Sequence, residues 1–251
     1  MIKKFDVDIT PFQLNRRIHL YLPVDYEESE ERYPVIYMYD GHNLFYDSDA
    51  TYGKSWGLKD YLDNYDMKFI VVGMECSHEG NRRLNEYCPY NLPGSRLGDI
   101  DGLGKVYMQW VVDELKPFID SHYRTLTNRE NTMIAGASMG GLMSLYSVVK
   151  HNDVFSRAAC LSSSFSICMN ELKDEIHNAS LNIDTKIYLD WGSDESWDKD
   201  ALAYSTARNL ELSHMLSLRG VNTYPCIVVH GIHNEVTWEK QVPVFMEYLW
   251  K

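Results

Sequence analysis

The sequence predicts an α/β fold, with a doubly wound and mostly parallel sheet, antiparallel strands at the N-terminal end and helices on both faces. Three observations support this prediction. The first two strand-like segments alternate apolar and polar residues, as strands with one buried face do. Later segments are continuous apolar runs, which are typical of parallel strands buried on both faces. Helical periodicity fills the gaps between these runs, as repeated βαβ units require.

The predicted strands fall into two groups. Residues 3–10 and 16–23 alternate and form the expected antiparallel pair, and the acidic segment 25–33 after them is expected to be a solvated loop. The strands expected to be buried on both faces are rich in Val, Ile, Leu, Ala and Tyr, and they are residues 33–41, 67–75, 131–137, 157–163, 185–192 and 222–231.

The predicted helices have apolar residues that recur every three or four positions. In the first of them, Trp110 and Leu115 fall near one face, and Pro117 should kink the helix or begin a new first turn. The four helices are residues 104–123, 140–151, 201–220 and 239–251.

Length and composition bound what the protein can be. The 251 residues, 45% hydrophobic and 24% charged, suit a single soluble α/β domain over residues 1–251. No run of about 18 apolar residues predicts a membrane span. The net charge of −12 repels phosphate backbones and anionic lipid, so we expect neither nucleic acid nor a membrane as partner. An exposed sheet edge or helix face could support a homo-oligomer, and no sequence pattern decides this.

Cysteine usage and the N-terminal residues predict a cytoplasmic protein. The five cysteines are odd in number and scattered without CxxC spacing, so we expect reduced thiols and neither disulfides nor a metal site. The stretch MIKKFDVDITPF has two lysines but no apolar segment after them, so we expect no secretory leader. We also expect no cofactor.

Residues 76–103 have no periodicity and contain many Gly, Pro and Asn residues. A loop of this length in a compact domain is usually functional. We therefore predict that it forms a lid or a wall of the substrate site.

Ser138 is the predicted nucleophile. Its motif, GASMG, lies between the buried strand 131–137 and a glycine-rich helix start, which is the strand–turn–helix setting that G-x-S-x-G requires. Side chains at positions 136 and 140 would collide with neighbouring backbone in such a strained turn. The helix N-terminus also favours a developing oxyanion. This setting makes a serine that only caps a helix the weaker interpretation.

A serine nucleophile needs a histidine base and an orienting carboxylate, which follow it in the order acid, then histidine. His233 is the predicted base because it lies in the loop after the last strand, at the edge where open α/β sheets bind ligands. His230, at the end of that strand, is the serious rival. A metal role for these two histidines is poorly supported, because no further ligand has a suitable context.

The acid is expected in the loop GSDESWDKD, after the penultimate strand. This loop offers several carboxylates, and spacing alone does not choose between Asp194 and Glu195. The predicted oxyanion hole consists of the backbone N–H groups of Met139 and of His42, in the segment DGHNLF after the third strand. The His42 side chain is expected to line the cleft.

Stretches across nearly the whole chain resemble the putative esterase family of α/β-hydrolases, which includes enterochelin esterase-like and esterase D-like serine esterases. The matching stretches are YPVIYMYDGHNLF, NRRLNEYCP, ELKPFIDSHYRT, IAGASMGGLMSLY, YLDWGSDE and GIHNEVTW. The resemblance implies the α/β-hydrolase fold. It places the acid three residues after the loop glycine, at Glu195, with Asp194 as runner-up. It matches His233 to the base, and Met139 and His42 to the oxyanion donors.

The predicted function is a serine carboxylesterase that hydrolyses a small acyl or aryl ester, and the family suggests a sugar or glycoside as the alcohol. The candidate substrate contacts are Trp56, Arg83, Glu86, Tyr87 and Trp197. Two alternatives remain: an acyltransferase with the same triad, and a catalytically silent hydrolase fold that binds a ligand. An intact serine, acid and histidine in the right order argue against the second.

Overall fold

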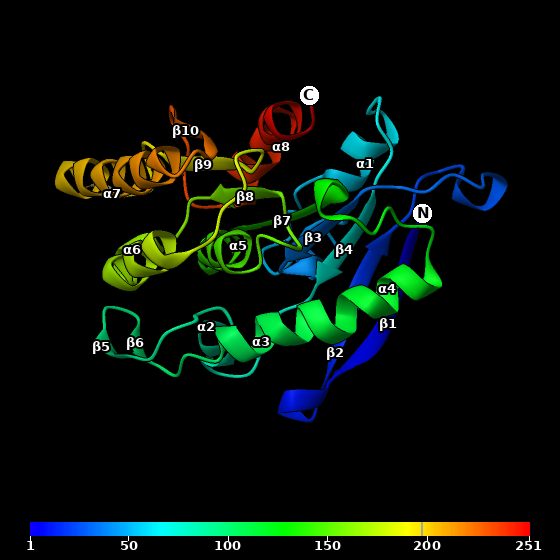
Figure 1. Ribbon diagram of the computed structural model, residues 1–251, viewed down its shortest axis with the longest axis horizontal. Coiled ribbons are helices and arrows are strands. Elements are labelled where there is room, and N and C mark those ends of the chain that lie inside the picture. The colour runs from blue at the N-terminus through cyan, green and yellow to red at the C-terminus, as the bar shows by residue number, and fades with distance from the viewer. Residues whose placement is uncertain (197) are drawn as a thin grey trace.

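The computed structural model describes residues 1–196 and 198–251, and it confirms the α/β fold (Figure 1). The strands of the central sheet are β1 (Ile2–Ile9), β2 (Leu14–Tyr21), β3 (Val35–Tyr39), β4 (Ile70–Met74), β7 (Thr132–Ala137), β8 (Arg157–Leu161), β9 (Lys186–Gly192) and β10 (Asn222–Val228). Their order across this eight-stranded sheet is β1-β2-β4-β3-β7-β8-β9-β10. β2 pairs antiparallel with β1 and β4, and the other neighbours are parallel. The predicted antiparallel start and parallel remainder are therefore confirmed.

Helices cover both faces of this sheet. They are α1 (Leu58–Asp63), α2 (Arg82–Glu86), α3 (Gly104–Trp110), α4 (Lys116–His122), α5 (Met139–Lys150), α6 (Met169–Asn178), α7 (Lys199–Leu218) and α8 (Glu235–Trp250). Buried side chains of α3 to α7 form one apolar layer against the sheet, and those of α1 and α8 form the other. In Figure 1, α1 and α8 lie above the sheet and α3 and α4 lie below it.

Strand β3 shows how the two apolar layers are separated. Tyr37 belongs to the layer of α3 to α7, whereas Ile36 and Met38 belong to the layer of α1 and α8. None of the three is more than 1% exposed. Because neither face of a central strand meets water, both sets of alternating side chains must be apolar, which explains the continuous runs in the sequence.

Strand β10 departs from the prediction of burial on both faces. Tyr224 and Ile227 in this strand are each 43% exposed. β10 is the last strand of the sheet, and among the described residues β9 alone pairs with it, so its outer edge is left unshielded by them. Pro225 suits this position. Proline has no N–H to donate, and an edge strand, unlike an inner strand, has a neighbour on one side only.

The helix predicted over 104–123 consists of three parts. α3 runs into the π-helical turn η4 (Val111–Leu115) and then into α4, in whose first turn Pro117 lies. The Lys116 N–H donates to Val111 O across the π-helical turn, and α4 then starts with Pro117 at one of its first two positions. Pro117 therefore begins a new turn, which is one of the two predicted outcomes.

Residues 76–103 contain more structure than their lack of periodicity predicts. They include α2 and a separate two-stranded sheet made of β5 (Leu92–Ser95) and β6 (Gly98–Ile100). These elements are only three to five residues long, which is too short for a hydrophobic period to become visible in the sequence.

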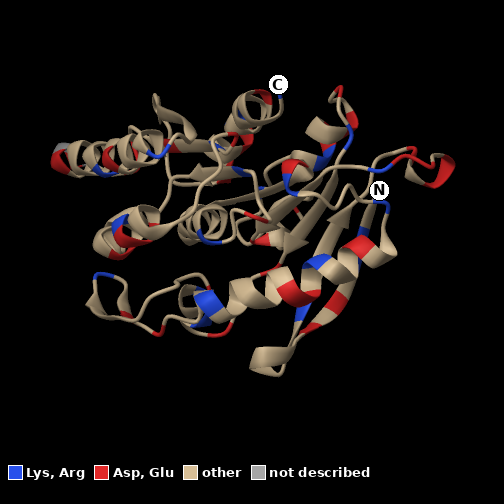
Figure 2. Cartoon of the chain, in the orientation of Figure 1, with Lys and Arg blue, Asp and Glu red and all other residues tan. Residues whose placement is uncertain are grey.

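Charged residues are spread over the whole molecule. Figure 2 shows Lys and Arg interspersed with Asp and Glu along the helices and the N-terminal strands. No helix within the described residues is long and apolar enough to cross a membrane. All five cysteines are free thiols, and four of them are buried.

Candidate active site

Ser138 occupies a strained turn between β7 and α5. Its backbone has φ 57° and ψ −119°, a conformation that residues with a side chain rarely adopt. The turn is tight enough that a Cβ atom at position 136 would lie 2.8 Å from the backbone of Gly140. Two hydrogen bonds hold it: the Ser138 N–H donates to Leu161 O at 2.9 Å, and Ser138 O accepts from the Ser164 N–H at 3.1 Å. The strain is therefore supported from the neighbouring strand and its loop.

Glu195 and His233 form a hydrogen-bonded pair. Oε2 of Glu195 lies 3.0 Å from Nδ1 of His233, and its Oε1 accepts the Gly192 N–H at 2.7 Å. Burial alone would raise the pKa of Glu195, but hydrogen bonds from His233 and Ser162 outweigh it and lower the pKa. The carboxylate is therefore ionised at neutral pH and can hold the imidazole ring in one orientation.

The pair exists because the loops after β9 and β10 leave the same edge of the sheet and touch. A Cβ atom at Gly192 would lie 2.2 Å from Gly231 O, so this close approach needs glycine. The Asp194 N–H donates to the same Gly231 oxygen at 2.9 Å. The two loops are thus fastened one residue ahead of Glu195 and two residues ahead of His233.

Trp238 connects the histidine loop to the strand loop beside Ser138. Its ring packs edge-on against His233, with the ring centroids 5.4 Å apart. Its indole Nε1–H donates to the Ser162 hydroxyl at 2.9 Å. Neither Trp238 nor Ser162 belongs to a motif that marks it as a site residue in the sequence. A signal was available for Trp238, which follows His233 by five residues and lies in the first turn of α8.

The rival residues form a second pair of their own. His230 Nδ1 lies 3.1 Å from Asp194 Oδ2, and the His230 side chain is 86% exposed. His230 does not line the cavity that contains Ser138, whereas His233 does. The structure thus brings Glu195 together with His233 and directs Asp194 to a solvent-exposed partner.

Ser138 and His233 face a common cavity of about 920 Å³. Their side chains are not hydrogen-bonded to each other within the described part of the chain. Instead, Ser138 Oγ lies 3.3 Å from Ser164 Oγ. Catalytic hydrogen bonds are often long or absent without substrate and tighten when it binds.

The two predicted oxyanion donors follow Ser138 and the neighbouring strand β3. Met139 is the first residue of α5, and His42 lies in the single 3₁₀ turn η3 (Gly41–Asn43) after β3. Neither backbone N–H donates a hydrogen bond to any described residue. The His42 side chain lines the cavity, as expected.

The predicted substrate contacts separate into three groups. Trp56 and Arg83 line the cavity, although the Arg83 guanidinium is also engaged by Asp40 at 2.7 and 2.8 Å. Glu86 and Tyr87 do not, which corrects the prediction: both are fully buried and unexposed. The reason is their partners, since Glu86 binds two arginines and the Tyr87 hydroxyl accepts the Asp40 N–H. Trp197 lies outside the described residues.

Sequence comparison gives a family and several relatives. A family model described as "Putative esterase" matches residues 10–248. The uncharacterized protein YbbA of Bacillus subtilis is 25% identical over 191 residues, which are 75% of this chain and 72% of YbbA. An endo-1,4-beta-xylanase/feruloyl esterase of Xylanibacter ruminicola is 27% identical over 62% of this chain and 20% of its own length. Esterase Rv1288 of Mycobacterium tuberculosis is 26% identical over 61% of this chain and 30% of its own length.

Solved structures share the fold at low sequence identity. An IroE-like serine hydrolase from Shewanella oneidensis has a TM-score of 0.77 and 19% identity, covering 99% of this chain and 79% of its own. A ferulic acid esterase has a TM-score of 0.73 and 20% identity, and the match covers 100% of this chain and 97% of the esterase. The enterobactin esterase Fes from Shigella flexneri has a TM-score of 0.76 and 16% identity, and the match covers 100% of this chain and 59% of Fes.

Proposed function

Because the chain belongs to the putative esterase family, and is therefore a carboxylic ester hydrolase, we propose that it cleaves esters through Ser138, His233 and Glu195. One observation carries this assignment. The ionised Glu195 holds His233 at 3.0 Å, and that histidine and the strained Ser138 line one cavity. A base, its orienting acid and a hydroxyl that opens to the substrate cavity are the three groups that nucleophilic catalysis of acyl transfer needs.

In the proposed mechanism, His233 takes the proton of the Ser138 hydroxyl as Oγ attacks the ester carbonyl carbon. The N–H groups of Met139 and His42 stabilise the negative charge on the carbonyl oxygen. The intermediate then collapses, and the alcohol leaves with the proton from His233. Water, deprotonated by the same histidine, attacks the acyl-enzyme. The acid product departs and the proton returns to Ser138, while Glu195 stabilises the imidazolium throughout.

The proposed substrate is a small acyl or aryl ester, and its alcohol part is a sugar or glycoside. A cavity of about 920 Å³ suits a ligand of this size. Tyr52, Trp56 and Trp238 line it; Tyr52 is 83% exposed and offers a ring face to an aromatic acyl group or a sugar, and the buried Trp56 and Trp238 add apolar edges to the wall. The names of the relatives, a feruloyl esterase and an enterobactin esterase among them, support an ester with an aromatic part.

Residues 76–103 are the proposed substrate wall. Cys76, Arg83 and Leu84 from this region line the main cavity. Arg96, in the turn between β5 and β6, lines a second cavity of about 240 Å³ to which Glu195 and His233 also belong. Both sides of the proposed base are therefore bordered by this region.

Hydrolysis of nitrophenyl esters tests the proposal. A panel with acetyl, butyryl, octanoyl and feruloyl groups should be turned over by the wild type, and Ser138→Ala should lower kcat by at least about 10⁴-fold. Ser121→Ala, an exposed serine on α4, is the matched control and should keep full activity. Undiminished turnover in Ser138→Ala would overturn the assignment of the nucleophile. A preference for the feruloyl ester would support the aryl alternative, a preference for acetyl would support the small acyl alternative, and a preference for octanoyl would contradict both.

A further inference from the structure

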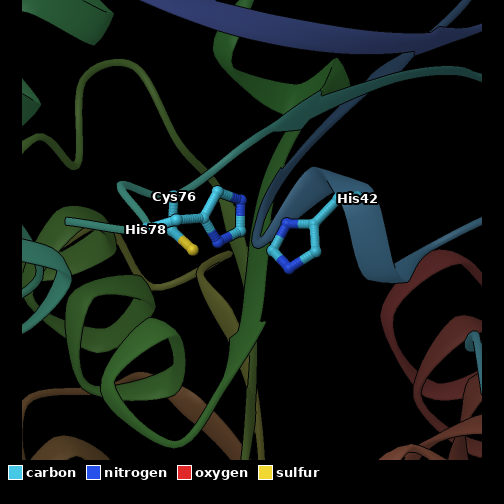
Figure 3. A group of neighbouring side chains, drawn as sticks. All are labelled: His42, Cys76 and His78. Atoms are coloured by element: carbon cyan, nitrogen blue, oxygen red, sulfur yellow. The ribbon is translucent and has the colours of Figure 1, made fainter. Parts of the chain in front are cut away.

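Three side chains that can bind a metal converge at the edge of the main cavity. His42 lies in the turn after β3, and Cys76 and His78 lie in the segment after β4. One ring nitrogen from each histidine and the Cys76 sulfur lie within 4.8 Å of one another. In Figure 3 the two imidazole rings and the thiol point toward one another. All three residues also line the cavity that contains Ser138.

His42 brings an unpaired nitrogen to this cluster. Only 6% of the residue is exposed, so little of its ring meets water. Nε2 is engaged by the Thr51 hydroxyl at 2.8 Å, whereas the buried Nδ1 has no hydrogen-bond partner among the described residues. A buried polar atom without a partner is costly, and a bound ion is one of the ordinary ways to satisfy it.

His78 is held in the manner of a metal ligand. Its Nε2 lies 3.1 Å from Glu75 Oε1, and Glu75 Oε2 is in turn 2.7 Å from His19 Nε2. Histidines that bind metals commonly donate one ring N–H to a carboxylate, which directs the other nitrogen to the ion. The Nδ1 of His78 makes no hydrogen bond within the described chain and is available in this way.

Cys76 supplies the soft ligand. It is 5% exposed, and its thiol contacts the Asp40 carboxylate, which Arg83 also binds. When a divalent cation replaces the thiol proton, one sulfur–metal bond forms and one proton leaves to solvent. The neighbouring carboxylate adds electrostatic attraction for the cation.

We propose that His42, Cys76 and His78 form a three-ligand site for a soft divalent cation, best matched by Zn²⁺. Two imidazoles and a thiolate suit Zn²⁺, and three protein ligands leave a coordination position open. That position adjoins the cavity that Ser138 lines, where it can take water or an oxygen of a bound molecule.

Binding requires a small contraction of the cluster. Ligand atoms around a tetrahedral Zn²⁺ lie about 3.3 to 3.6 Å apart, given the usual bond lengths. The three ligand atoms of the cluster lie within 4.8 Å of one another, so the longest of these separations must shorten by about an ångström. The His78 side chain can make this movement, because it is 56% exposed and lies at the outer end of the hydrogen-bonded series His19, Glu75, His78.

Metal titration tests this proposal without reference to ester hydrolysis. Protein stripped with a chelator and dialysed should bind one Zn²⁺ per chain in calorimetry. Co²⁺ in its place should give a thiolate-to-metal charge-transfer band in the near-ultraviolet. Cys76→Ser should abolish that band, and His78→Gln, a change at an exposed residue, should weaken Zn²⁺ binding by at least about tenfold.

Cys226→Ser is the matched control, because it removes a half-buried thiol on β10 outside the cluster. This variant should still bind one Zn²⁺ per chain and should still give the thiolate-to-Co²⁺ charge-transfer band. Circular dichroism of each variant separates loss of binding from loss of fold. Failure of the folded wild type to bind Zn²⁺, or a cobalt band that persists in Cys76→Ser, would overturn the proposal.

Discussion

Glu195 and His233 are separated by 38 residues in the chain, yet their side chains meet at 3.0 Å. The adjacent residue, Asp194, turns to His230 instead, at 3.1 Å. Two acid–histidine pairs thus arise from the same two loops. His233 of the first pair lines the cavity that Ser138 also lines, whereas His230 of the second pair is 86% exposed, so each proposed catalytic substitution has a control of the same chemistry.

Glu195→Gln should lower kcat by about 10³- to 10⁴-fold, because the amide neither stabilises the imidazolium nor enforces the right tautomer of His233. Asp194→Asn should leave kcat within about twofold of the wild type, because its partner lies outside the cavity. Steady-state kinetics on the preferred nitrophenyl ester measures both. The reverse order of effects would make Asp194 the triad acid.

His233→Ala should remove nearly all turnover, by about 10⁴-fold or more, because no other group takes the proton of Ser138. His230→Ala should be close to the wild type. Since residues that act as a unit are not additive, adding Glu195→Gln to His233→Ala should cost little further activity. A large additional loss in the double variant would show that the two side chains act separately.

Glu86→Gln should destabilise the fold by about 3 to 5 kcal/mol, since it leaves the buried charge of Arg16 without its partner. Glu86 is unexposed and binds Arg16 at 2.7 Å and Arg82 at 2.9 Å. Asp6→Asn breaks the exposed pair with Arg17 and should cost far less stability, because solvent screens that pair. Urea denaturation compares the two, and equal losses would contradict a structural role for Glu86.

Asp190 should make the protein less stable as the pH rises. Burial raises the pKa of this carboxyl from 3.8 to about 7. Below about pH 4 both the folded and the unfolded states hold the proton, so the group contributes nothing. Between about pH 4 and pH 7 the unfolded state ionises first, and stability falls by up to about 4 kcal/mol. Above about pH 7 this cost remains in full.

Asp190→Asn tests this dependence, because the amide oxygen can still accept the Ser162 N–H that Asp190 Oδ1 accepts at 3.0 Å. The variant should lack the decline between about pH 4 and pH 7. Urea denaturation at a series of pH values measures the difference from the wild type. A difference that stays constant with pH would show that Asp190 does not titrate in this range.

The setting of Ser138 was predictable because every signal for it is local. A buried strand, the GASMG turn and an apolar helix follow one another within about twenty residues, and periodicity and turn chemistry act at that range. Burial was harder to predict. Glu86 and Tyr87 have the polar and aromatic character of substrate contacts, and only their packing against Arg16 and Asp40 removes them from the cavity.

The sequence by itself determined the strands of the central sheet with their parallel and antiparallel arrangement, the helical segments of α3 to α5, α7 and α8, and the loops in which the serine, acid and histidine lie; it did not predict α1, α2, α6, β5 or β6. Tertiary structure decided which acid meets which histidine, because this depends on the contact of Gly192 with Gly231. It also decided that β3 and β4 are neighbours, which brings His42 to Cys76 and His78. Contacts between segments this far apart leave no periodic trace along the chain, since they form only when the sheet has assembled its edge.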